Sequence, residues 1–242
     1  MHKTFIFDLD DTLIYNQHLY SLAQIEFAKF TSEALGPRCP NVQTLINHEV
    51  TVDIELVKKL GMRTNRFPTS FKETFLHFAA VMGQTGNGTA ILAEQAYQIG
   101  ERVFNPAHWE KTLVPGAEKT LDYLIGQGDE LYLLTTGDET IQRKKVEHFG
   151  TNRWFQGRTT IVPIEKLTRI REIVSSKNPT TTWFVGNSVR SDILPALEAG
   201  IGAIYIPQET WMYESTHPPI PTSPRLIRLE EISEIEPRYA TL

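Results

Sequence analysis

Residues 5–13 read FIFDLDDTL, and this stretch decides which fold we expect. Its apolar start is rich in aromatic and β-branched residues, which predicts a buried strand. The strand ends at three closely spaced carboxylates, Asp8, Asp10 and Asp11, followed by Thr12. Open α/β sheets bind their ligands beyond the carboxyl ends of the strands. Because like charges repel each other, an ionised cluster here implies a cation, and carboxylate oxygens suit Mg²⁺. The alternative is an acidic turn that caps a helix.

The second half of the chain alternates between strand and helix signals. Short apolar runs predict strands, and amphipathic segments between them predict helices, at residues 117–127 (helix), 131–134 (strand), 140–149 (helix), 160–162 (strand), 164–175 (helix), 182–185 (strand), 192–199 (helix) and 203–206 (strand). This order is typical of a parallel sheet with right-handed crossovers. Residues 225–229 could add an edge strand. Residues 211–214, WMYE, either border the ligand site or form a packed aromatic loop, and we favour the loop.

Between these two regions, residues 17–109 show helical periodicity and few strand signals. Apolar residues recur three and four positions apart, as Phe71, Phe75 and Phe78 do. The segment 18–35 similarly carries Leu22 and Ile25 on what is broadly one apolar helical face. We therefore expect an α/β fold in which residues 1–16 and 110–242 form the catalytic core and residues 17–109 form an inserted helical domain.

Composition excludes several classes of protein. The formal net charge of −5 argues against nucleic acid as the main partner. The single cysteine, Cys39, rules out an intrachain disulfide and fits a reducing compartment. No apolar run approaches the ~18 residues that indicate a membrane span, and the acidic cluster interrupts any signal peptide. We expect a cytoplasmic protein with no membrane partner.

Polar residues follow the predicted strands at the points where they end. Since parallel strands direct these ends to one edge of the sheet, we expect the residues to converge. They are Asp8, Asp10, Thr135, Thr136, Lys166, Asn187, Ser188 and Asp192. Such a set suits phosphoryl transfer, because a metal and a lysine neutralise phosphate oxygens while a hydroxyl donates a hydrogen bond to one of them.

Two basic positions leave alternatives open. Lys145 competes with Lys166 for the role of the phosphate-neutralising lysine, but we interpret Arg143, Lys144 and Lys145 as a solvated helix face. Arg190 either reaches the substrate or lies at the surface.

These residues resemble the haloacid dehalogenase-like hydrolases. Residues 8–12, DLDDT, are similar to the first motif of that family, D-x-D-x-T, and residues 133–137, LLTTG, are similar to the second. Lys166 resembles the lysine of the third motif, and residues 186–192, GNSVRSD, resemble the fourth, usually G-D-x-x-x-x-D. The insertion is similar to the helical type 1 cap of the family in position and helicity.

The resemblance implies a Rossmann-like core and a Mg²⁺-dependent phosphatase that hydrolyses small phosphorylated metabolites. Asp8 would be the nucleophile that forms an aspartyl-phosphate, and Asp10 would protonate the leaving alcohol and later deprotonate water. The implied metal ligands are the Asp8 carboxylate, the Asp10 backbone carbonyl, Asn187 and Asp192. The implied substrate-binding residues are Thr135, Thr136, Lys166 and Arg190.

Two positions bear on the choice of reaction. Asn187 stands where the family usually has aspartate, and its amide oxygen can bind Mg²⁺ without supplying charge. Dehalogenases of this family lack the second motif-one aspartate, so Asp10 favours a phosphate ester over a haloacid. The alternatives are a phosphomutase or a dehalogenase of the same family, or a catalytically weak binding protein.

Overall fold

The computed structural model describes residues 2–208 and 219–242. The chain forms two compact units, which we call the core unit, Met1–Gln17 with Glu110–Leu242, and the helical unit, His18–Trp109. The predicted aromatic loop at residues 211–214 lies outside the described residues.

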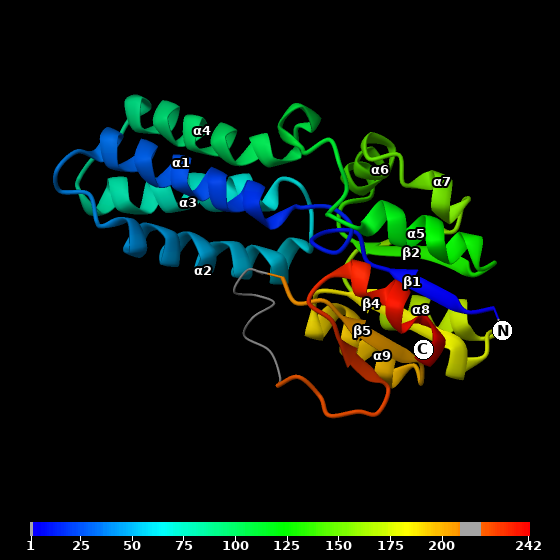
Figure 1. The fold of residues 1–242 in the computed structure, drawn as a ribbon. Helices are drawn as coiled ribbons and strands as arrows, with labels where there is room; N and C mark the ends of the chain where they lie inside the picture. Colours follow the sequence, from blue (N-terminus) through cyan, green and yellow to red (C-terminus); the bar gives the residue numbers. More distant parts are fainter. Residues whose placement is uncertain (1, 209–218) are drawn as a thin grey trace. The chain divides into compact units, whose positions relative to one another are not determined.

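The core unit is built on a six-stranded sheet in which every pair of neighbouring strands is parallel. The strand order is β3-β2-β1-β4-β5-β6, with β1 at the centre (Figure 1). The strands are β1 Thr4–Phe7, β2 Glu130–Thr136, β3 Thr159–Val162, β4 Thr182–Gly186, β5 Gly202–Tyr205 and β6 Leu226–Arg228. This confirms the predicted α/β fold with a Rossmann-like parallel sheet, and β6 is the edge strand expected near residues 225–229.

Alternate residues of the central strands face opposite sides of the sheet, as the two-residue period of a strand requires. The helices of the core unit are α5 Ala117–Gly126, α6 Glu139–His148, α7 Asn152–Phe155, α8 Leu167–Val174, α9 Leu194–Glu198 and α11 Ile235–Arg238. Phe5 and Phe7 join a hydrophobic cluster with α5, α7 and α11, whereas Ile6 joins a second cluster with α8 and α9. Figure 1 shows α5 on one face of the sheet and α8 and α9 on the other. The sheet is therefore buried on both faces.

Two predicted helices begin later than expected. The helix predicted from residue 164 begins at Leu167, because Pro163 and the exposed Ile164 belong to a loop that leads from β3. The helix predicted from residue 192 is preceded by η4 Val189–Ile193, a single π-helical turn. Short turns of this kind are frequent at functional sites.

Among the described residues, the 3₁₀-helices are η1 Arg102–Phe104, η2 Pro106–His108, η3 Pro179–Thr181, η5 Ile232–Glu234 and η6 Tyr239–Thr241.

The helical unit has its own aromatic core. Its helices are α1 Gln17–Leu35, which begins in the core unit, α2 Val42–Leu60, α3 Arg66–Val81 and α4 Asn87–Glu101. The rings of Phe27 and Phe71 stack with centroids 4.4 Å apart, and Phe75 is fully buried. Our assignment of Leu22 and Ile25 to the inward face was wrong, because they are 58% and 66% exposed.

Across the described part of the chain, no helix combines the length and apolar character needed to cross a membrane.

Candidate active site

The centre of the site is an ammonium group between two carboxylates. Asp8 follows β1, Lys166 immediately precedes α8, and Asp192 lies on η4 beyond β4. The Lys166 Nζ donates to Asp8 Oδ1 at 2.5 Å and to Asp192 Oδ1 at 2.7 Å. All three residues are at least nine-tenths buried. The structure thus brings together three predicted residues that are far apart in the sequence.

The backbone around β4 holds Asp192 in place. Asp192 Oδ2 accepts a hydrogen bond from the Ser188 backbone N–H at 2.9 Å. A Cβ atom added at Gly186 would lie 2.3 Å from the same oxygen, so this close approach requires glycine. Both Asp192 oxygens therefore accept hydrogen bonds within the protein.

Burial changes the protonation of this group of charges. Burial raises the pKa of Asp8 to about 7, and Asp192 acts in the same direction, while Lys166 opposes both. Burial alone would lower the pKa of Lys166, but the carboxylates of Asp192 and Asp8 outweigh it and hold that pKa above its usual value. Lys166 therefore stays a cation, and a further positive charge near Asp8 would favour its ionised form.

Oxygen atoms from two strand ends converge near Thr12. The Thr12 hydroxyl lies 3.5 Å from Asp8 Oδ2 and 3.3 Å from Asn187 Oδ1. These are hard oxygen ligands of the kind that Mg²⁺ prefers, so the Asp8 and Asn187 side chains fit a magnesium ion. No three His, Cys, Asp or Glu side chains of the described residues form a metal-binding group by themselves. Such an ion would thus need Asn187 or backbone and water oxygens as well.

Asp10 is held by α6 and not by Lys166. The Lys145 Nζ lies 2.7 Å from Asp10 Oδ1 and 2.9 Å from Asp10 Oδ2. Our interpretation of Lys145 as part of a solvated helix face was wrong, since it is 4% exposed, although Arg143 and Lys144 are exposed as expected. The α6 helix turns Lys145 inward, next to the buried Val146, where a carboxylate compensates its charge.

The predicted phosphate-binding hydroxyl also contacts α6. Gln142 Nε2 lies 2.6 Å from Thr135 Oγ1 and 3.0 Å from Asp10 Oδ2. The hydroxyl of Thr136, the last residue of β2, is buried and has no hydrogen-bond partner among the described residues. Arg190 lies half-buried on η4. The substrate roles of these residues stay predictions.

Asp11 joins the site to the first helix. It has a left-handed backbone with φ of 56°. Its Oδ1 accepts hydrogen bonds from the backbone N–H groups of Asn16 and Gln17 at 2.8 and 2.9 Å. The third carboxylate of the acidic cluster is thus a structural cap at the start of α1.

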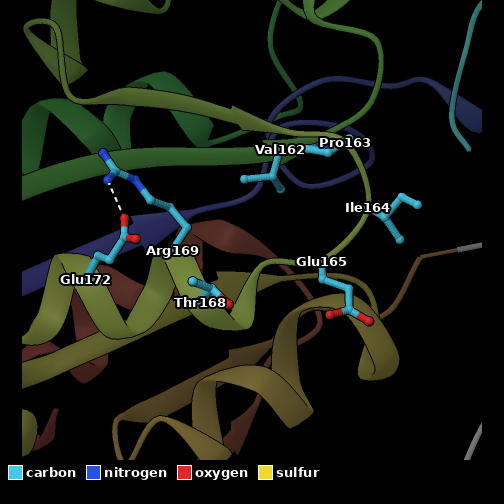
Figure 2. Close-up of a pocket in the computed structure, with 7 residues that line it drawn as sticks. All are labelled: Val162, Pro163, Ile164, Glu165, Thr168, Arg169 and Glu172. Atoms are coloured by element: carbon cyan, nitrogen blue, oxygen red, sulfur yellow. Dashed lines mark hydrogen bonds and ion pairs between the residues drawn. The ribbon is translucent and has the colours of Figure 1, made fainter.

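A shallow pocket of about 530 Å³ lies beside the loop that carries Lys166. Figure 2 shows its lining, from the end of β3, the following loop and α8: Val162, Pro163, Ile164, Glu165, Thr168, Arg169 and Glu172. Arg169 forms an ion pair with Glu172 at 2.7 Å. None of the predicted catalytic residues lines this pocket.

Sequence reasoning missed Gln142 and the inward position of Lys145. A signal was present, because the two residues are three positions apart and therefore share a helix face. Asp138 caps that helix with hydrogen bonds to the N–H groups of Thr140 and Ile141. This cap fixes where α6 begins just after β2, and hence which of its residues point back toward Thr135.

Comparison with known proteins identifies the type of chain. A family model described as a haloacid dehalogenase-like hydrolase matches residues 2–200. No curated protein matches the sequence.

The solved structures that match have low sequence identity. A haloacid dehalogenase-like family hydrolase from Xanthomonas campestris is 22% identical with a TM-score of 0.73, and the match covers 99% of this chain and 91% of that chain. YfnB from Bacillus subtilis, in a structure bound to magnesium, is 18% identical with a TM-score of 0.59, covering 97% and 96%. A 2-haloacid dehalogenase from Pseudomonas syringae is 18% identical with a TM-score of 0.57, covering 100% and 99%. A protein described as a predicted phosphoglycolate phosphatase from Haemophilus somnus also matches. The shared fold therefore does not separate dehalogenases from phosphatases.

Proposed function

Because the chain belongs to the haloacid dehalogenase-like hydrolases, we propose that it is a Mg²⁺-dependent phosphatase that hydrolyses small phosphomonoesters. The observation that carries this proposal is the second carboxylate, Asp10, which is held by Lys145 and Gln142 and linked through Gln142 to Thr135. An alkoxide leaving group needs a proton, whereas a halide does not. A fixed acid at this place favours the phosphate ester over the haloacid.

The nucleophile in this proposal is Asp8. Its Oδ1 is held by Lys166, and its Oδ2 lies 3.5 Å from the Thr12 hydroxyl. Attack forms an O–P bond to Asp8 and breaks the ester O–P bond, while the protonated form of Asp10 gives its proton to the departing alkoxide. Asp10 then takes a proton from water, which attacks phosphorus and releases inorganic phosphate and free Asp8.

Positive groups of the site match the charge of the phosphoryl group. Lys166 uses two of its three hydrogens on Asp8 and Asp192, and no described residue accepts the third. The side chains of Asp8 and Asn187, the backbone carbonyl of Asp10 and, directly or through water, Asp192 would hold the magnesium ion. A bound ion would neutralise phosphate oxygens and favour the ionised form of Asp8, whose pKa burial otherwise raises.

Two assays test the proposal. The purified protein is given p-nitrophenyl phosphate with and without Mg²⁺, and separately a 2-haloacid with detection of chloride. We expect phosphate release that requires the metal and no release of chloride. Chloride release without phosphate release would make the protein a dehalogenase, and the absence of both would support a binding protein. A panel of metabolite phosphates, from sugar phosphates to nucleoside monophosphates, then identifies the preferred substrate.

A further inference from the structure

Lys145 is a buried cation with all its donors in use. It accompanies Arg143 and Lys144 in sequence, yet those two residues face solvent while Lys145 is 4% exposed. Its three ammonium hydrogens match three acceptors, namely Asp10 Oδ1, Asp10 Oδ2 and, at 2.9 Å, Asn16 Oδ1. No hydrogen remains for a phosphate oxygen, so any effect of Lys145 on the reaction passes through the residues that it holds.

The hydrogen bonds to the Asp10 carboxylate occupy its two oxygens unequally and leave Oδ1 available for a leaving group. Oδ2 accepts from both Lys145 and Gln142, whereas the contact of Oδ1 with Lys145 is its one contact to a described side chain. The side chain of Asp10 is 23% exposed, in contrast to 5% for Lys145. Oδ1 is therefore the oxygen that can face a leaving group, and Oδ2 is the oxygen that is fixed.

Gln142 orients a second group in the same way. Its amide donates to Thr135 Oγ1 at 2.6 Å, which makes that hydroxyl an acceptor in this contact. The single hydrogen of the hydroxyl then remains for another acceptor. Gln142 is 2% exposed and lies one helical turn before Lys145, so α6 presents both groups from the same face.

We propose that Lys145 and Gln142 are positioning residues, which aim Asp10 at the leaving oxygen and the Thr135 hydroxyl at the phosphate. This proposal rests on the proposed phosphatase function. In this proposal, the inward face of α6 sets the geometry of proton transfer, while Lys166 and the metal ligands neutralise the charge of the phosphate. Loss of Lys145 should therefore harm the expulsion of poor leaving groups more than that of good ones.

The test compares two aryl phosphates of nearly equal shape. p-Nitrophenolate leaves readily without a proton, whereas phenolate is more basic and depends on one. Single-turnover release of each phenol is measured with the wild-type protein and Lys145→Met, which keeps most of the length of the side chain and removes its charge. A correctly placed general acid contributes roughly 10²–10⁴-fold. We expect Lys145→Met to slow phenyl phosphate at least about tenfold more than p-nitrophenyl phosphate.

Three further variants separate positioning from general structural damage. Lys144→Met, one residue away on the exposed face of α6, should leave both rates unchanged. Asp10→Asn and the double variant Asp10→Asn/Lys145→Met should have equal rates, because Lys145 has no route to the reaction once Asp10 cannot transfer a proton. The double variant also removes both charges of the buried pair, so it stays informative if Lys145→Met alone fails to fold.

The outcomes are distinct. A wild-type protein that releases phosphate from neither ester with Mg²⁺ overturns the proposed function and this inference with it. An active wild type with equal slowing of both esters in Lys145→Met, or a further loss on adding Lys145→Met to Asp10→Asn, overturns the inference alone.

Discussion

Glu49 is a fully buried acid of the helical unit, and its hydrogen bonds indicate that it is neutral. Ser70 Oγ lies 2.6 Å from Glu49 Oε1 and 2.7 Å from the Phe67 carbonyl. A hydroxyl has one hydrogen, so both contacts are satisfied when Ser70 donates to Phe67 and a protonated Glu49 donates to Ser70. Burial, followed by the nearby Asp53, raises the pKa of Glu49 to about 8.

The neutral Glu49 predicts a pH-dependent cost in stability. In the unfolded chain Glu49 ionises above about pH 4.5, while in the folded protein it stays protonated to about pH 8. The folded state binds the extra proton, so the free energy of unfolding falls as pH rises through this window. Glu49→Gln, which keeps the shape of the neutral acid and has an N–H donor in place of its O–H, should be more stable than wild type by on the order of 2–4 kcal/mol at pH 8.

Denaturant unfolding of both proteins at pH 4 and pH 8 checks this prediction. The difference should shrink to near zero at pH 4, where both states of Glu49 are protonated. Glu55→Gln, an exposed position on the same helix, is the control and should show no such trend. A difference that is independent of pH would show that Glu49 is ionised in the folded protein.

Asn187 supplies a neutral amide oxygen at the position where the fourth motif of the family usually has the charged carboxylate of an aspartate. Asn187→Asp would add a negative charge near the Asp8 carboxylate, so it should strengthen Mg²⁺ binding by roughly threefold to tenfold. Calorimetric titration of both proteins with Mg²⁺ measures this. Unchanged affinity would exclude the Asn187 side chain from the metal site.

At the scale of residues, the sequence predicted which side chains meet around Asp8 better than it predicted which side chains hold Asp10. Asp8, Lys166 and Asp192 each follow a strand, and the parallel sheet directs those ends to one edge, so their meeting follows from topology. The partner of Asp10 depended instead on the rotation of α6 about its axis. With Gln142 and Lys145 turned inward, the apolar periodicity of that helix is weak. The charged run at residues 143–145 therefore predicts a solvated face from sequence alone.

Among the elements, β4 and the π-turn after it define the position of Asp192. Gly186 ends the strand, and an added Cβ there would lie 2.3 Å from Asp192 Oδ2 and 2.5 Å from its Cγ. Gly186→Ala should therefore displace the Asp192 carboxylate, reduce phosphate release at least about tenfold and cost about 1–3 kcal/mol of stability.

Steady-state kinetics and thermal unfolding measure these two effects. Gly88→Ala is the matched control, since a Cβ at Gly88 meets no atom within 4 Å. Full activity of Gly186→Ala would show that the site tolerates movement of Asp192, and would remove that residue from the essential set.

The sequence also predicted most of the elements, because apolar runs and turn residues mark them clearly. The predictions that were wrong, on the start of α8 and the inward face of α1, have physical reasons. The start of α8 was placed too early since Ile164 looks like an inward helical residue but lies 45% exposed in the loop after Pro163. The inward face of α1 is set by Leu19, Ala23 and Phe27, and not by Leu22 and Ile25. Both faces of that helix carry apolar residues, so periodicity alone could not choose between them.

In the whole molecule, each unit has a core of its own. Phe71 is fully buried against Phe27 and Phe67 within the helical unit, with ring centroids 4.4 and 4.7 Å away. Phe71→Ala should destabilise the helical unit by about 3–5 kcal/mol. Hydrogen exchange should then accelerate within His18–Trp109, while the strands of the core unit keep their protection. Equal acceleration in β1 and β4 would show that the two units unfold as one.

If Asp8 is the nucleophile, it carries the phosphoryl group during the reaction, and mass spectrometry can detect that group. The protein is mixed with p-nitrophenyl phosphate and Mg²⁺, quenched in acid within the first turnover, digested and analysed by mass spectrometry. We expect the peptide containing Asp8 to gain the mass of one phosphoryl group and the same peptide of the Asp8→Asn variant to gain none. Phosphate release without any adduct on Asp8, or an adduct on a different residue, would contradict it.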